Sequence, residues 1–182
     1  MSKTFATDTP GTLTTRAYAE AVHYETDEGG WEPIDVALTP GREGRLENGA
    51  NSFGLSVAAD SGQGLLAELD LGQGRRIGFS LDAEHKRPGV ADRASGGSAV
   101  VYRQVRPHVD LRLTSTATGL KEELVLRSPA APDTFEFPLR LEGVRAQLDP
   151  ATGAVVYHDA AGELVAAVPA GWMEDAAGGT PG

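Results

Sequence analysis

Four histidines are the residues of this chain with the most obvious capacity for chemistry, and they stand at His23, His85, His108 and His158. No two of them have the spacing of zinc ligands, and no HExxH stretch occurs, so we expect them at strand ends or in loops rather than around a metal. Because the chain has no cysteine, a Cys nucleophile, thiolate metal sites and disulfides are excluded.

Pairs of acidic residues could serve a glycosidase, which needs two carboxylates across a cleft, one of them with a raised pKa. The candidate pairs are Asp110 with Glu122 or Glu123, and Asp35 with Glu32. These acids alternate with apolar residues, which predicts that they lie on the solvent face of an antiparallel sheet. We therefore predict no catalytic residues and expect that the chain is not an enzyme.

Nucleotide, serine-hydrolase and metal motifs are also weak. Gly72-Gln73-Gly74 begins like a dinucleotide fingerprint, but the third glycine and a following helical pattern are missing. There is no P-loop and no Gly-x-Ser-x-Gly elbow. We predict no cofactor; calcium stays open, because the acidic turns at Asp27-Glu28 and 149–153 could supply oxygen ligands, although neither follows the EF-hand loop.

The elements that must position these residues follow a strand period. Apolar and polar residues alternate from Leu65 to Leu71 and again from Ile77 to Leu81, on either side of the glycine-rich turn. Turn signals recur at intervals of about eight to twelve residues, which predicts an all-β fold, an antiparallel β-sandwich of jelly-roll-like or related type with many short hairpin-connected strands. The other predicted strands lie within 14–24, 31–38, 53–57, 100–105, 109–113, 120–126, 135–141, 146–148, 155–157 and 164–168.

A chain of 182 residues suggests one main domain. We predict an irregular N-terminal arm over 1–13, the β-sandwich domain over 14–170, and a flexible tail or linker over 171–182. The polar stretch 83–97 is predicted to be a long exposed loop. The start Met1-Ser2-Lys3 lacks a following apolar core, so no signal peptide is expected in this chain.

The formal net charge of −10 would repel a phosphate backbone, so we expect no nucleic acid partner. No apolar run is long enough to span a membrane, and we expect no membrane insertion. If the domain binds a ligand such as a glycan, exposed aromatic side chains would carry it, and aromatic residues are only 6% of the chain. The predicted ligand-binding residues are Trp31, Trp172, Tyr18 and Tyr102, although Trp31 could instead pair with Tyr24 across a hairpin.

Three stretches carry a family resemblance. They are Val22-His23-Tyr24 with Gly29-Gly30-Trp31-Glu32-Pro33-Ile34-Asp35, then Val109-Asp110-Leu111-Arg112-Leu113-Thr114 with Thr118-Gly119-Leu120-Lys121-Glu122, and Leu148-Asp149 with Gly153, Asp159 and Gly162-Glu163-Leu164. Their order and spacing resemble the β-rich N-terminal region of large secreted bacterial proteins of the Rhs-repeat and DNRLRE-domain type. The resemblance implies a non-catalytic structural or interaction module of a larger secreted or cell-surface, polymorphic-toxin-like protein. The alternative is a carbohydrate-binding β-sandwich module.

The resemblance also implies a setting. The expected partners are other domains of the same polypeptide or proteins at the cell surface, and the expected location is extracellular or at the cell surface. It transfers no catalytic residue to this chain.

Overall fold

The computed structural model describes residues 2–6, 13–17, 20–62, 64–81, 89–92 and 96–175. Their regular structure consists of β-strands, apart from one 3-10 turn at Arg42–Gly44, and no α-helix occurs among them. The prediction of an all-β fold built from antiparallel sheets is confirmed. No helix long and apolar enough to cross a membrane occurs in the part of the chain that the structure describes.

The largest sheet has six strands in the order β14-β9-β8-β7-β6-β5, and all its pairs are antiparallel. Alternation gives this sheet one apolar face: Leu55 stands opposite Leu69, which stands opposite Ile77. The strands are β5 (Asp35–Pro40), β6 (Leu46–Ala50), β7 (Gly54–Val57), β8 (Ala67–Asp70), β9 (Arg76–Phe79) and β14 (Leu139–Glu142).

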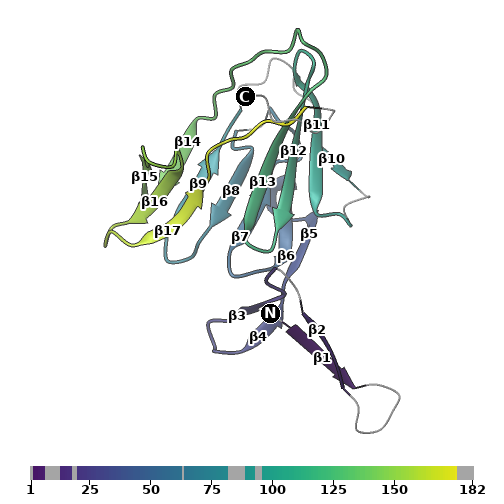
Figure 1. The fold of residues 1–182 in the computed structure, drawn as a ribbon, viewed down its shortest axis with the longest axis vertical. Coiled ribbons are helices and arrows are strands. Elements are labelled where there is room, and N and C mark those ends of the chain that lie inside the picture. Colours follow the sequence, from purple (N-terminus) through teal and green to yellow (C-terminus); the bar gives the residue numbers. More distant parts are fainter. Residues whose placement is uncertain are drawn as a thin grey trace.

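A four-stranded sheet packs against this face and completes a sandwich (Figure 1). Leu111 and Leu113 are fully buried on its inner side, together with Tyr102, and they share one core with Leu55 and Val57 of the larger sheet. Burial of these apolar rows on both sheets is the main force that holds the layers together. The strands are β10 (Gly89–Asp92), β11 (Ala99–Arg106), β12 (Val109–Thr116) and β13 (Gly119–Leu126).

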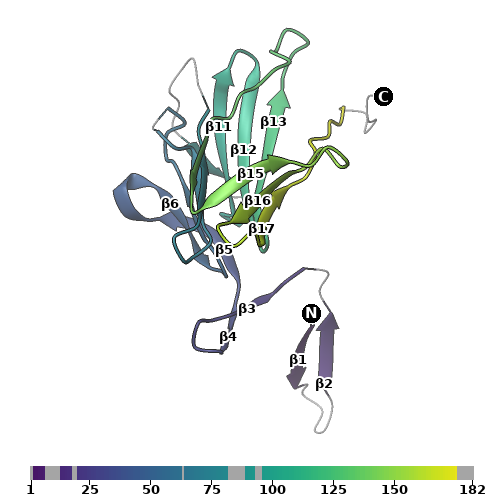
Figure 2. The same ribbon diagram turned by 90° about the vertical axis from the view of Figure 1, so that its left-hand side faces the viewer.

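A three-stranded meander forms a second, smaller core. It consists of β15 (Val144–Leu148), β16 (Val155–Asp159) and β17 (Leu164–Val168). Val144 and Tyr157 are buried with Ile77 of β9. Phe79, two residues further along β9, packs into the main core. The four-stranded sheet and the meander therefore cover the same face of the six-stranded sheet, side by side (Figure 2).

Two hairpins lie at one end of the sandwich, β1 (Ser2–Ala6) with β2 (Leu13–Ala17), and β3 (His23–Glu25) with β4 (Trp31–Pro33) (Figures 1 and 2). The strand β1 lies within the segment that we expected to be irregular. The predicted turn at Asp27–Gly30 joins β3 to β4, but Trp31 stands opposite Glu25 rather than Tyr24 and is 63% exposed. The aromatic cross-strand pair does not form.

Two other predicted elements differ from the structure. The strand expected over 135–141 begins only at Leu139, because residues 134–138 include Pro138 and form no ladder. The loop expected over 83–97 contains the strand β10, which pairs with β11. The rest of that loop lies partly outside the described residues. The predicted domain bounds stay a prediction.

Candidate functional site

The hairpin of β11 and β12 contains an irregularity that gathers polar side chains. Tyr102 stands opposite Leu111, and the next aligned pair is Arg106 with Val109. Residues 103–105 of β11 therefore face the single residue Asp110 of β12. Such a β-bulge bends the strand and changes the direction of its side chains, and bulges are frequent beside functional sites.

The backbone of this hairpin is strained at two residues. Gln104, inside the bulge, has a φ of 53°, and His108, in the turn between the strands, has a φ of 62°. Residues other than glycine disfavour this left-handed region, although histidine adopts it more often than most residues. Pro107 precedes His108, and a proline followed by a residue of positive φ is the pattern of a type II turn. Strain of this kind persists only where surrounding contacts hold it, and it clusters at functional sites.

Asp110 supplies those contacts. Its Oδ1 accepts a hydrogen bond of 2.9 Å from the backbone N–H of Gln104. Its Oδ2 accepts one of 2.9 Å from Nη1 of Arg103, and two of 2.7 and 3.1 Å from Nη2 and Nε of Arg127. The backbone N–H of Arg127 donates a 2.7 Å bond to the carbonyl of His108, which ties the end of β13 to the turn. One carboxylate thus joins three chain segments.

The electrostatic result is a buried anion under two exposed cations. The side chain of Asp110 is only 6% exposed, whereas those of Arg103 and Arg127 are 61% and 54% exposed. Burial alone would raise the pKa of Asp110, but the Gln104 hydrogen bond and the guanidiniums of Arg127 and Arg103 outweigh it, so the pKa is lowered. Asp110 therefore stays ionised and fixes both guanidiniums.

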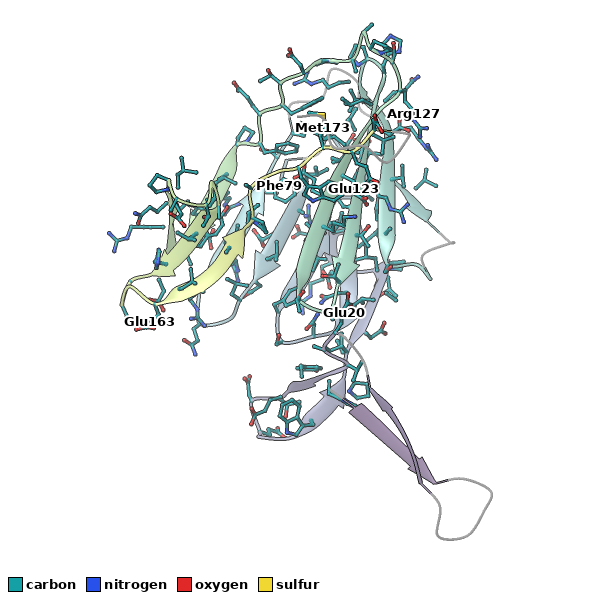
Figure 3. The ribbon with its side chains drawn as sticks, in the orientation of Figure 1. Glu20, Phe79, Glu123, Arg127, Glu163 and Met173 are labelled. Carbon is teal, nitrogen blue, oxygen red and sulfur yellow. The ribbon has the colours of Figure 1, made fainter. Side chains whose placement is uncertain are left out.

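These groups line an open pocket with a volume of about 370 Å³, formed by Arg103, Gln104, His108, Asp110 and Arg127. Figure 3 shows Arg127 at the end of the four-stranded sheet that lies away from β1 to β4. Each guanidinium has N–H donors beyond those that reach Asp110. The pocket can therefore bind an oxyanion with its arginines while an imidazole stands beside it.

The predicted ligand-binding residues do not meet in the structure. Tyr102 is fully buried, and its hydroxyl donates a 2.6 Å hydrogen bond to the carbonyl of Ala58, so it has no face for a ligand. Trp31 lies on β4 and Trp172 follows β17, and they are 63% and 71% exposed. Tyr18 lies outside the described residues. Ligand binding by the two tryptophans stays a prediction.

Two of the acids predicted to lie on the solvent face differ from that expectation, Asp110 by its burial and Glu122 by the row on which it stands. Asp110 is on the outward row but is covered by the arginines that it binds. Glu122 stands opposite the fully buried Leu113 and so belongs to the inward row. Although Glu122 is an exposed residue, partial burial of its carboxyl raises the pKa to about 7. Glu123 contacts Arg112 and Lys121 instead of Asp110.

The histidines were predicted at strand ends or in loops. His108 lies in the turn between β11 and β12 and His23 at the start of β3, whereas His158 lies within β16. His85 is outside the described part of the chain. Three residues that form the pocket, Arg103, Gln104 and Arg127, were not among the candidate functional residues predicted from the sequence. One signal was present: the apolar period runs through Val100 and Tyr102 and then shifts to Val105, which is the pattern that a bulge produces.

Comparisons with known proteins place this chain beside bacterial nucleases. No family model matches it, and no solved structure matches it. It is 26% identical over 176 residues to the tRNA nuclease WapA of Bacillus subtilis (strain 168), and 25% identical over 176 residues to the tRNA3(Ser)-specific nuclease WapA of Bacillus spizizenii. Each alignment covers 91% of this chain but 7% of the relative, so the chain spans a small part of the length of these relatives.

These names correct the predicted identity and function and bear on the predicted partners. The assignment to the N-terminal region of Rhs-repeat and DNRLRE-domain proteins was wrong, because the relatives are named tRNA nucleases and nothing in the matches supports an N-terminal region of a larger protein. The non-catalytic module, its carbohydrate-binding alternative and the expectation of no enzyme are contradicted by the same names. The absence of a nucleic acid partner conflicts with them as well. The extracellular or cell-surface location and the calcium alternative stay predictions.

Proposed function

We propose that this chain takes part in the cleavage of tRNA and that its Arg103–Arg127 pocket contacts the phosphate backbone. The names of the relatives supply the reaction and the class of substrate. One observation carries the assignment to this pocket: the buried carboxylate of Asp110 holds two exposed guanidiniums in fixed positions beside His108. Arginine pairs held in this way suit bidentate contacts to phosphate oxygens.

The two arginines bind and stabilise charge in this proposal. A phosphodiester that is attacked by a neighbouring hydroxyl gains negative charge on its non-bridging oxygens, and donors fixed in advance stabilise that charge without reorganising. Asp110 is a positioning residue, because its hydrogen bonds point toward Gln104, Arg103 and Arg127 and not toward solvent. Its lowered pKa keeps this arrangement intact at neutral pH.

His108 moves the proton. Histidine is the side chain whose charge ordinarily changes between pH 5 and 8, which suits it to general acid–base catalysis. Its imidazole accepts the proton of a ribose 2′-hydroxyl as the 2′ oxygen forms a bond to phosphorus. The bond from phosphorus to the 5′ oxygen then breaks, and the imidazolium returns the proton to that leaving oxygen.

The overall charge of −10 does not oppose this assignment as strongly as it first suggests. Charges separated by more than about 8 Å of solvent are largely screened at physiological ionic strength. A phosphate in the pocket meets Arg103 and Arg127 directly, and the nearest carboxylate, Asp110, already bonds to both. The two local arginine contacts therefore make the affinity rise as salt is lowered, and long-range repulsion by the acidic remainder of the chain offsets part of that rise.

The test uses end-labelled tRNA with the purified full chain and measures binding and cleavage separately. We expect Arg127→Ala to weaken tRNA binding about tenfold or more, as loss of a charge-assisted phosphate contact does. We expect His108→Gln to retain binding and to lower the cleavage rate about 10²- to 10⁴-fold. Arg145→Ala on β15 and His23→Gln on β3 are the matched controls, because both residues lie on strands outside the pocket.

The proposal fails if the wild-type chain neither binds nor cleaves tRNA. It also fails if the control variants lose as much as the pocket variants, since the effect would then belong to charge or stability in general. Thermal unfolding of each variant shows whether the fold is retained.

A further inference from the structure

More cations continue from the pocket along the outward rows of β12 and β13. Arg112 and Lys121 stand on these rows: Arg112 is opposite Glu123, and Lys121 is opposite Thr114. The intervening residues of β12, Leu111 and Leu113, are fully buried, which shows that the row between them faces outward. The side chains of Arg112 and Lys121 are 34% and 52% exposed.

This outer face differs in charge from the molecule as a whole. With the two pocket arginines, the outward rows of β11 to β13 and the end of β13 carry four cationic side chains and two carboxylates, Asp110 and Glu123. The complete chain carries ten more acidic than basic residues. Glu123 lies between the cations, 2.8 Å from Nζ of Lys121 and 3.7 Å from Nε of Arg112.

The other side chains of this face indicate what kind of nucleic acid fits it. On these three strands, which are described without gaps, the other outward residues that reach the surface are Gln104 in the bulge and the small or β-branched Val101, Thr114, Thr116, Gly119 and Val125. Binding of single strands relies on aromatic side chains on which bases stack, and none stands on these rows. Duplex RNA is instead recognised by shape and by contacts to phosphates and 2′-hydroxyls.

We propose that the outer face of β11 to β13 is a docking surface for the phosphate backbone of base-paired RNA and leads the cleaved strand into the pocket. This rests on the proposed function and names the substrate class, the duplex stem. From Arg127 to Lys121 the face extends for about 20 Å along β13. A duplex of that length presents several phosphates of each strand.

The segment that follows β17, residues 169–175, passes near this surface. Residues 169–175 run in front of the four-stranded sheet in Figure 1 and beside β13 in Figure 2, and they include Trp172, Glu174 and Asp175. Duplex RNA docked on the outer face would meet this segment. Trp172 is also the one exposed aromatic residue of the segment, so it provides a direct test of base stacking against backbone contact.

The most informative variant is expected to raise the affinity for duplex RNA and not to lower it. Glu123→Gln removes a negative charge from between two cations, and we expect it to tighten binding of a short RNA duplex about threefold at low salt. Glu163→Gln is the matched control: it makes the same change of charge in the turn before β17, far from Glu123 in Figure 3. Lys121→Gln should weaken duplex binding and lower the salt slope by about one.

The measurements are titrations of the full chain with a labelled RNA duplex and with an unpaired RNA of equal length, at several salt concentrations. We expect tighter binding of the duplex than of the unpaired RNA, and Trp172→Ala should not weaken binding of the duplex. Equal effects of Glu123→Gln and Glu163→Gln overturn the docking surface. Preference for the unpaired RNA, or loss of binding in Trp172→Ala, overturns backbone recognition in favour of stacking.

These outcomes are separable from failure of the proposed function. If Arg127→Ala and His108→Gln abolish tRNA cleavage while Glu123→Gln behaves like its control, the pocket stands and the docking surface falls. If the wild-type chain binds no RNA of either kind, both fall together.

Discussion

Two regions of this molecule use an aspartate to shape a hairpin, and they use it differently. In the turn between β15 and β16, Asp149 accepts hydrogen bonds from the backbone N–H of Ala151 and the hydroxyl of Thr152, both within three residues of it. At the bulged hairpin of β11 and β12, Asp110 accepts hydrogen bonds from Gln104, Arg103 and Arg127, which lie between six and seventeen residues away.

The two aspartates differ in whether their hydrogen-bond partners keep further donors that could bind a ligand. Asp149 uses its oxygens on groups of its own turn, and these bonds, led by that from Thr152, lower its pKa without bringing any other charge nearby. Asp110 instead holds two arginines, one in the bulge of β11 and one directly after β13, and their outer N–H groups stay available. An acid that closes its turn locally is a structural device, whereas an acid that gathers distant arginines creates a site.

Removal of each aspartate is the strongest test of this comparison. Asp110→Ala leaves the bulge without its backbone partner and leaves two arginines beside each other, and we expect it to lower the free energy of unfolding by about 2 kcal/mol or more. Asp149→Ala should lower the melting temperature less, because its turn is exposed and water replaces the lost partners. Thermal unfolding of both variants measures the difference; equal losses would show that Asp110 has no more than a turn-closing role.

The strand pattern was largely predictable because alternation is local. The strands 54–57, 67–70, 76–79 and 109–116 fall where apolar residues alternate, and the meander of β15 to β17 follows turn residues that are legible in the sequence. The predicted strand began too early, at residue 135, for a physical reason: Phe135 and Phe137 alternate, but they pack into the core from an irregular segment that ends at a proline.

The pocket was not predictable in the same way. Asp110 was noticed as an acid, yet its partners come from a bulge in one strand and from the residue that follows another, and alternation says nothing about either. The spacing of three residues between Tyr102 and Val105 indicates a bulge only if both side chains are known to be buried in the core, and the structure shows that they are. Arg127 lies seventeen residues from Asp110 and meets it because β13 pairs with β12 in register.

Backbone strain gives a second, smaller test. His108 has a φ of 62°, a backbone conformation that glycine adopts without steric cost. We therefore expect His108→Gly to raise the free energy of unfolding by about 0.5 to 1 kcal/mol. The same variant should abolish proton transfer, because it removes the imidazole. Gly153, at a φ of 72° in the turn of Asp149, provides the opposite control, since Gly153→Ala adds strain and places its Cβ 3.3 Å from that of Ala170. Denaturant unfolding with cleavage assays measures both, and a His108→Gly variant less stable than wild type would contradict strain at the turn.

The smallest expected effect separates the two acids of the β12–β13 hairpin by their pH dependence. Partial burial raises the pKa of Glu122 to about 7, above the value of about 4.3 in an unfolded chain, so the folded state binds more protons between these limits. Stability contributed by protonated Glu122 is therefore present at acid pH and lost as the pH rises through about 7. The lowered pKa of Asp110 has the opposite sign: its contribution is present above the unfolded value of about 3.9 and is lost as the pH falls further.

Glu122→Gln tests this pair directly, because glutamine keeps the size of the side chain and cannot ionise. We expect the variant to melt about 1 to 3 °C above wild type at pH 8 and to lose that advantage at pH 5, the effect being small because solvent screens an exposed residue. Asp110→Asn should show its largest loss at pH 7 and approach wild type only as the pH falls below the unfolded value of about 3.9. If Glu122→Gln melts at the same interval from wild type at every pH, the carboxyl of Glu122 is fully solvated, and the inward row of β13 is open to water at that point.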